Sequence, residues 1–385
     1  MEMKQIYNLV NLATRETIGD SAVVNEDLSN LVDVGTAIMN ANSLDKYVKS
    51  LVDHIGKVIF VNRPYRGSVP SVLMDGWEYG AILEKVSSSM PVATENESWE
   101  LENGASYDPN IFTKPNVSAK FFNKRTTFEI PLSIVERQVK SAFSNAEQQN
   151  GFLSMLYTGV ENSATVKTDS LIMRTINNFT GETFYNMNSS GTYTGAGNTR
   201  AINLLKLYND RYSKSLTAAD ATSDPDFIRF AVYEMGLVKS RLRRMSRLFN
   251  IGAQDRFTPD DRLHFVLLDV FASGADVFLQ SDTFHDEFTR LPKAETVPYW
   301  QGSGTGYAFS DISAINVTTA DGHTVTPSGI LGVMFDRDAL GVSNIDRRVT
   351  TNYNAKAEFY NSWYKFDAGY FNDFNENFIV FYAAS

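Results

Sequence analysis

Apolar residues near the start of the chain recur at helical spacing. Between Leu44 and Ile55 they lie three to four positions apart, and Gly56, a residue type that commonly follows the end of a helix, comes next. We therefore predict one amphipathic helix here, carried on an extended N-terminal arm formed by residues 1–60.

The pattern changes to long strand-like stretches over residues 61–131. Runs typical of strands cover residues 78–86 and 117–130. Between them lies the dipeptide Asn103-Gly104, which favours a tight turn because both residues tolerate a positive φ. We predict a β arm that folds back on itself.

The middle of this predicted arm is unusually acidic. Its acids are Glu95, Glu97, Glu100, Glu102 and Asp108. Among them lie Trp99, Leu101 and Tyr107, which have no apolar partner nearby in the sequence. Large apolar side chains are normally buried, so we expect these three residues to contact a neighbouring molecule.

Two Ser-x-x-Glu capping boxes, Ser133–Glu136 and Ser144–Glu147, predict two successive helices. The second box precedes a broad apolar stripe that ends at Thr180-Gly181. This pattern predicts a helix of roughly 30 residues, or about 45 Å. Such a helix is longer than most globular helices and indicates a structural spine.

Helical and strand-like patterns alternate in the next part of the chain. Asp224-Pro225 predicts a helix start, and helical spacing continues to Met245. Apolar runs at 263–268 and 329–335 are typical of buried strands. This alternation predicts a compact α/β unit.

The C-terminal stretch is aromatic and strand-like. Tyr364, Phe366 and Ala368 alternate with polar residues or glycine, which indicates a half-buried strand. Residues 377–382 form an apolar run that predicts a buried final strand. The whole pattern places the chain in the α+β class.

Composition excludes several classes of protein. The chain has 35 Lys+Arg against 45 Asp+Glu and a net charge of −10, so a basic nucleic-acid-binding protein is not expected. It has no cysteine, which excludes disulfides, thiolate zinc sites, iron–sulfur clusters and cysteine nucleophiles. No run approaches the roughly 18 apolar residues that cross a bilayer, so we expect no membrane association.

Residues capable of catalysis are present but do not form a recognisable motif. The four histidines lack metal-ligand spacing; they are His54, His264, His285 and His323. Asp260-Asp261 resembles the acidic first turn of a helix. Asp336 and Asp338 follow a predicted strand without an accompanying nucleophile or base, and we expect them to cap a helix. We therefore assign no catalytic, cofactor-binding or metal-ligating residue and expect no enzyme.

One basic cluster stands out in this acidic chain. Lys239, Arg243 and Arg247 lie at i, i+4 and i+8 and would share one face of a helix. They could form a solvated face, meet acids of a neighbouring molecule, or contact a phosphate backbone. Because an assembly of acidic chains repels itself, we expect them to meet carboxylates of a neighbouring subunit instead of DNA.

The order of these parts resembles the major capsid protein of tailed bacteriophages. The resemblance covers nearly the whole chain, and its most suggestive pieces are residues 49–59 in the N-terminal arm and 332–341 before the terminal aromatic strands. The arm segment looks most like the coat proteins of small short-tailed phages of Gram-positive hosts.

The resemblance implies a structural subunit of an icosahedral head. Such subunits assemble into hexamers and pentamers that enclose double-stranded DNA, with scaffolding and portal proteins as partners and non-specific contact with DNA on the inner face. The expected location is the virion capsid, after assembly in the host cytoplasm. The implied domains are the N-terminal arm 1–60, an extended β loop 61–131 lying over an adjacent subunit, a peripheral domain 132–225 with 345–385, and an axial domain 226–344.

Two other classes of protein stay open at this point. One is an α/β hydrolase using Asp336 or Asp338, which would need a deep pocket converging on these acids. The other is a tail or fibre protein, which would form elongated trimers. Electron microscopy of the purified protein separates all three classes, because only a capsid protein gives closed shells or hexameric capsomers.

Overall fold

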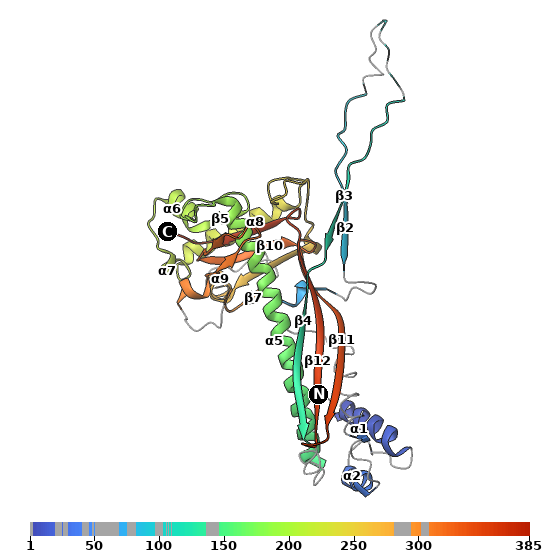
Figure 1. Ribbon diagram of the computed structural model, residues 1–385. Coiled ribbons are helices and arrows are strands. Elements are labelled where there is room, and N and C mark those ends of the chain that lie inside the picture. Colours follow the sequence, from blue (N-terminus) through green and yellow to red (C-terminus); the bar gives the residue numbers. More distant parts are fainter. Residues whose placement is uncertain are drawn as a thin grey trace. The chain divides into compact units, whose positions relative to one another are not determined.

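The chain divides into two compact units. The computed structural model in Figure 1 describes residues 3–19, 25, 30–40, 46–47, 50, 69–74, 82–96, 103–104, 106, 108, 110–135, 146–280, 294–301 and 308–385. Unit 1 comprises Met1–Tyr79, Arg125–Met173 and Val342–Tyr370, and unit 2 comprises Gly80–Lys124, Arg174–Gly341 and Phe371–Ser385. Helix α5 (Ala146–Met187) and strands β11 (Leu340–Asn354) and β12 (Phe359–Asn372) contribute residues to both units.

Unit 1 contains a four-stranded sheet in the order β1–β11–β12–β4. Figure 1 shows β11, β12 and β4 side by side. The short strand β1 (Leu73–Met74) follows a 3₁₀ turn, Pro70–Val72, and β4 (Arg125–Val135) pairs antiparallel with β12. Tyr364 and Phe366 of β12 are fully buried, whereas Lys365 between them is partly exposed. The predicted alternation is confirmed at Lys365 but fails farther along, because Asp367 is also buried.

One prediction in unit 1 is wrong, and another is not tested. Ser133 lies inside β4, and its hydroxyl donates a hydrogen bond to Asn361 Oδ1 at 2.6 Å. The first capping box therefore starts no helix at Ser133, because pairing with β12 satisfies this backbone instead. At the N-terminus, helices α1 (Met3–Ile18) and α2 (Leu31–Asn40) precede the predicted helix 44–55, most of which lies outside the described residues.

Helix α5 begins near its predicted start but runs 42 residues, through Gly181 to Met187. A Cβ atom on Gly181 would lie 3.1 Å from the Cβ and Cγ1 atoms of Val317. The glycine therefore allows close packing and does not end the helix. The Thr183 hydroxyl donates a hydrogen bond to Phe179 O, one helical turn earlier, at 2.9 Å. The helix is therefore continuous past Gly181.

Unit 2 is centred on a five-stranded sheet. Its strands, in spatial order, are β5 (Ala201–Asn203), β13 (Phe378–Tyr382), β10 (Ile330–Asp336), β6 (Leu263–Leu268) and β7 (Glu295–Val297). The central strand β10 is antiparallel to both neighbours and buried along its length. The three buried strands predicted from apolar runs, β6, β10 and β13, are confirmed.

Helices α6 (Leu204–Tyr212), α8 (Pro225–Leu242) and α9 (Asp269–Gln280) share one apolar core with this sheet. The Asp224 carboxylate accepts a hydrogen bond from Phe227 N at 2.7 Å and caps α8, as predicted. The helix stops at Leu242, whose carbonyl accepts from Thr258 N at 2.8 Å, so the predicted continuation to Met245 is wrong.

Smaller elements complete unit 2. They are α7 (Ala218–Ala221), a 3₁₀ turn at Asp260–Arg262, α10 (Phe309–Ile312), and the pair β8 (Val317–Thr318) and β9 (Thr324–Val325). In the described ranges, no helix combines the length and the apolar character needed to span a membrane.

A separate two-stranded hairpin also belongs to unit 2. Strands β2 (Leu83–Ser88) and β3 (Val117–Phe122) pair antiparallel, which confirms that the predicted arm folds back on itself. The predicted strand-like run 117–130 is divided, because residues beyond Lys124 join β12 in the sheet of unit 1.

Candidate functional site

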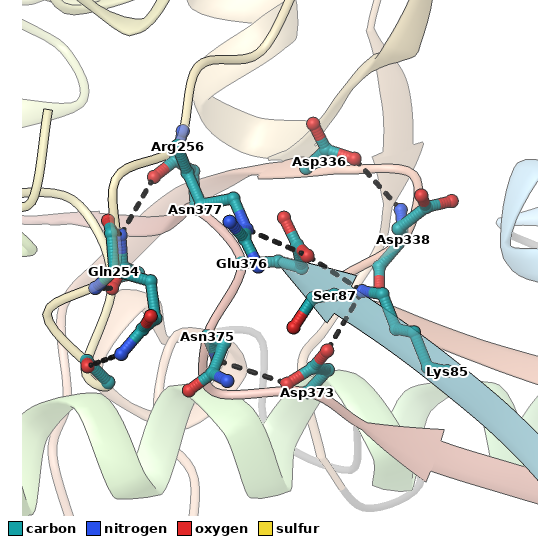
Figure 2. A network of polar contacts seen from close by, with 12 residues as sticks. Lys85, Ser87, Gln254, Arg256, Asp336, Asp338, Asp373, Asn375, Glu376 and Asn377 are labelled. Atoms are coloured by element: carbon teal, nitrogen blue, oxygen red, sulfur yellow. Dashed lines mark hydrogen bonds and ion pairs between the residues drawn. The ribbon is translucent and has the colours of Figure 1, made fainter. Parts of the chain in front are cut away.

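Two lysines lie directly opposite each other at the base of the β2–β3 hairpin. Lys85 pairs with Lys120 in the ladder, a placement that would be repulsive without a counter-charge. Asp373 supplies that counter-charge. Lys85 Nζ lies 2.8 Å from Asp373 Oδ2 (Figure 2). Lys120 Nζ lies 2.9 Å from Asp373 Oδ1. One carboxylate therefore joins both strands to the turn after β12.

The environment of Asp373 favours its charged form. The side chain is only 3% exposed, and burial alone would raise the pKa of this carboxyl. The hydrogen bonds from Lys85, Lys120 and Asn375 N, together with the positive charge of Lys85, outweigh burial and hold the pKa of Asp373 below its usual value. Asn375 N also donates to Asp373 Oδ1 at 3.1 Å, which orients the carboxylate.

Glu376 extends the network to a second loop. Its Oε1 atom lies 2.8 Å from Lys85 Nζ and 3.2 Å from Arg256 Nε (Figure 2). Lys85 also donates to the carbonyl oxygen of Asp338 at 3.2 Å. Two loops of unit 2 thus contact Lys85 directly, and a third reaches it through the Arg256–Glu376 pair.

The loops beneath these residues are held by buried polar contacts. Thr258 donates to Asp336 Oδ2 at 2.8 Å and accepts from Asn377 Nδ2 at 3.1 Å. Asp338 N donates to Asp336 Oδ1 at 2.9 Å. Burial raises the pKa of Asp336, and these hydrogen bonds only partly offset that effect.

Chemically, this arrangement is an anchor. Every charge in it faces an opposite charge or a backbone dipole, and removal of one partner would leave a buried group unsatisfied. The rings of Phe122 and Phe371, 5.2 Å apart, add an apolar contact beside it. Ion pairs and aromatic packing therefore fix the base of the hairpin to the rest of unit 2.

Beyond this base, the hairpin exposes apolar side chains. Val92 is 88% exposed, Phe112 83% and Ile111 74%. The three residues predicted to contact a neighbour, Trp99, Leu101 and Tyr107, lie outside the described residues. The exposure of Val92, Ile111 and Phe112 nevertheless shows that the rest of unit 2 does not bury the described part of the arm.

The predicted basic cluster finds partners within its own chain. Lys239 and Arg243 both contact Asp260, the former at 3.7 Å, and Arg247 makes a two-point contact with Asp255 at 2.7 and 2.8 Å. Because α8 ends at Leu242, Arg243 and Arg247 do not extend the helical face of Lys239.

The two acids considered for a hydrolase are engaged in structural contacts. The prediction that they cap a helix is wrong, because the chain passes from β10 through a short turn directly into β11. Asp336 is 4% exposed and holds the turn described above, and Asp338 pairs with Arg262. Neither of two cavities in the described part of the chain, of about 490 and 430 Å³, has Asp336 or Asp338 in its lining. Over the same residues, no group of three or more His, Asp or Glu side chains is arranged to hold a metal ion.

The anchor itself was missed by sequence reasoning. Lys85 is 288 positions from Asp373 and Lys120 is 253, and no motif links them. In the structure Lys85 lies on the half-buried face of β2, but the sequence Leu-Glu-Lys-Val-Ser-Ser has no apolar alternation that would mark this face.

Comparison with known proteins gives the family. Residues 10–382 match the model of the family described as "Phi29-like phage major capsid protein". The major capsid protein of Bacillus phage GA-1 is 26% identical over 160 residues, covering 38% of this chain and 33% of that protein. The aligned stretch thus spans about a third of the curated relative.

One solved structure supports the fold. A chain in the structure of the head fiber and inner core protein of native bacteriophage P68 has 11% identity, covers 84% of this chain and 86% of its own length, and gives a TM-score of 0.51. A chain in the capsid of Staphylococcus phage Andhra has 11% identity, 82% and 83% coverage and a TM-score of 0.48. The P68 likeness shows a shared fold, and the family match over nearly the full sequence shows that this chain belongs to the Phi29-like phage major capsid protein family.

Proposed function

We propose that the chain is the structural subunit of an icosahedral phage head. Copies assemble into hexamers and pentamers that enclose double-stranded DNA. The observation that supports this most directly is the β2–β3 hairpin, which is anchored at its base and exposes Val92, Ile111 and Phe112 beyond it. Such a hairpin is suited to contact a neighbouring subunit.

The energy available from that contact is substantial. Full burial of one large apolar side chain contributes about 1.5–3 kcal/mol. Each arm carries several such side chains, and every copy in a shell repeats the contact. Trp99, Leu101 and Tyr107 are proposed members of this interface, as are Lys239, Arg243 and Arg247 through the parts of their side chains that stay exposed.

The proposed domains, partners and location of the subunit are those that the family implies. The proposed parts are the N-terminal arm 1–60, the extended loop 61–131, the peripheral domain 132–225 with 345–385, and the axial domain 226–344. Scaffolding and portal proteins are the proposed partners, packaged DNA is contacted non-specifically, and the subunit acts in the virion capsid after assembly in the host cytoplasm. This role is structural and involves no catalysis.

Deletion of residues 93–112 tests the proposal. The variant is expressed with and without a candidate scaffolding protein and imaged by electron microscopy beside the full chain. We expect shells from the full chain, and a folded subunit without shells from the variant. Normal shells from the deletion would refute the role of the arm, and elongated trimers from the full chain would favour a fibre protein.

A further inference from the structure

The larger of the two cavities, about 490 Å³, is lined by residues of helix α6, of helix α8 and of the turn that follows α6. Its volume lies in the range of small-molecule sites, about 300–1,000 Å³. Tyr208 and Phe230 in its lining are 1% and 6% exposed, whereas Tyr212 and Tyr233 are 51% and 56% exposed. The cavity therefore combines buried aromatic side chains with aromatic rings that solvent reaches.

The same cavity concentrates positive charge in an acidic chain. Its lining, made of described residues, includes three cations, Arg211, Lys214 and Arg229, and one acid, Asp226. The chain as a whole has a net charge of −10, so this positive excess is local. A hollow surface that carries an excess of one charge attracts a ligand of the opposite charge.

The ion pairs of these cations are long. Lys214 Nζ lies 3.3 Å from Asp226 Oδ2, and Arg229 Nη1 lies 3.6 Å from Oδ1 of the same carboxylate. Arg211 Nη1 lies 3.4 Å from Glu234 Oε1. A charge-assisted hydrogen bond is typically about 2.7–2.9 Å long. Because exposed pairs of this kind contribute little to stability, the three cations can turn toward an incoming anion at small cost.

The cations also lie close to the aromatic rings. The guanidinium carbon of Arg211 lies 5.8 Å from the ring centres of both Tyr212 and Phe230. Lys214 Nζ lies 5.2 Å from the ring centre of Tyr208 and 2.8 Å from its hydroxyl oxygen. A ligand with a flat ring against these side chains would therefore hold an attached anionic group within reach of a cation.

We infer that this cavity binds a nucleoside monophosphate. Its base would stack on Tyr212 and Tyr233, because every base offers a flat face to an aromatic side chain. Its phosphate would be bound by Lys214 and Arg229. An inorganic anion would leave the exposed rings in water, and an uncharged aromatic molecule would leave the positive charge unmatched. A DNA duplex keeps its bases inside the helix, so it would not use the rings either.

This binding site does not require copies of the chain to assemble, so its test is independent of the proposed function. Binding of radiolabelled dAMP to the full chain is measured by equilibrium dialysis. We expect one saturable site per chain, from which deoxyadenosine and inorganic phosphate each displace the label at least tenfold less well than unlabelled dAMP. Irradiation with 8-azido-dAMP should label peptides within residues 208–233.

Several outcomes of this experiment would overturn the inference. Displacement by phosphate as effective as that by dAMP would indicate a simple anion site. Tighter binding of single-stranded oligo-dA than of dAMP would assign the cavity to a DNA strand instead of a free nucleotide. Absence of saturable binding, or labelling confined to other peptides, would show that the cavity does not bind this class of ligand.

Removal of the acid in the lining provides a test that a folding defect cannot imitate. Asp226→Asn should strengthen dAMP binding severalfold, because Lys214 and Arg229 lose their competing carboxylate. Asp276→Asn is the matched control, since Asp276 is exposed on α9 and does not line the cavity. Unchanged or weaker binding in Asp226→Asn, or an equal gain in the control, would contradict the assignment.

Loss of binding is tested at the cations and at one ring. Lys214→Gln with Arg229→Gln should weaken dAMP binding at least tenfold, whereas Lys167→Gln with Lys356→Gln, at exposed positions outside the lining, should not. Tyr233→Leu keeps an apolar side chain but removes the flat ring, so it should weaken binding of dAMP and leave that of phosphate unchanged. Thermal unfolding confirms that each variant is folded, and undiminished dAMP binding in folded variants would overturn the inference.

Discussion

Lys85 and Lys120, opposite each other in the β2–β3 ladder, share the carboxylate of Asp373. The consequence is that one buried acid fixes both strands of the hairpin to the turn after β12. Loss of that acid would leave two like charges facing each other. The anchor therefore depends on a residue far away in the sequence.

Replacing Asp373 by Asn should destabilise the subunit by about 1–3 kcal/mol, since both ammonium groups lose their charged partner but can still turn toward water. Urea unfolding of the unassembled chain measures the change. Asp210→Asn is the matched control, because Asp210 forms only an exposed pair with Lys206. Equal stability of the two variants would contradict the anchor.

The pH dependence of stability should differ in sign between two buried acids. The pKa of Asp373 is lowered in the folded chain, so its stabilising contribution is present above the unfolded-state value of about 4 and is lost as the pH falls. The pKa of Asp336 is raised by burial, so its contribution is largest below about 4 and is lost as the pH rises through the folded value.

Urea unfolding of the unaltered chain, Asp373→Asn and Asp336→Asn between pH 3 and pH 7 checks this. With rising pH, the stability of the unaltered chain should increase relative to Asp373→Asn and decrease relative to Asp336→Asn. Two differences that change in the same direction would be inconsistent with these environments.

Two glycines of helix α5 should respond oppositely to substitution. A Cβ on Gly159 meets no atom within 4 Å, so Gly159→Ala should stabilise the helix by about 0.5–1 kcal/mol. Gly181→Leu should overpack against Val317 and cost about 1–3 kcal/mol, and Val317→Ala should recover part of that loss. Thermal unfolding gives both values, and a neutral Gly181→Leu would disprove the close packing.

The Arg247–Asp255 pair should be detectable before assembly. Arg247→Glu should slightly lower the melting temperature of the unassembled subunit, because two carboxylates then face each other, and Asp255→Arg in the same chain should restore it. Differential scanning calorimetry measures the change. A melting temperature unaffected by Arg247→Glu would show that this pair contributes nothing to the isolated subunit.

Local patterns predicted much of the fold. The buried strands β6, β10 and β13 follow from their apolar runs, and the Asp224 cap follows from Asp-Pro chemistry. Local signals failed where tertiary contacts decide the outcome. The capping-box residue Ser133 is paired into a strand by β12, and Gly181 continues a helix because Val317 packs against it.

The candidate site was less predictable than the fold. The exposed arm could be anticipated from its acids and unpartnered aromatics. Its anchor could not, because Lys85, Asp373 and Glu376 meet only after distant segments pack together. The same reason applies to the basic cluster, since only the structure brings Asp255 and Asp260 to it.

The central claim is that the arm of one subunit contacts a neighbour in a closed shell. A cryo-electron microscopy reconstruction of particles assembled from the full chain tests it most directly. We predict a closed shell of pentamers and hexamers in which residues 89–113 of each copy lie against an adjacent copy. Particles of another form, or a closed shell in which these residues touch only their own chain or solvent, would contradict the account.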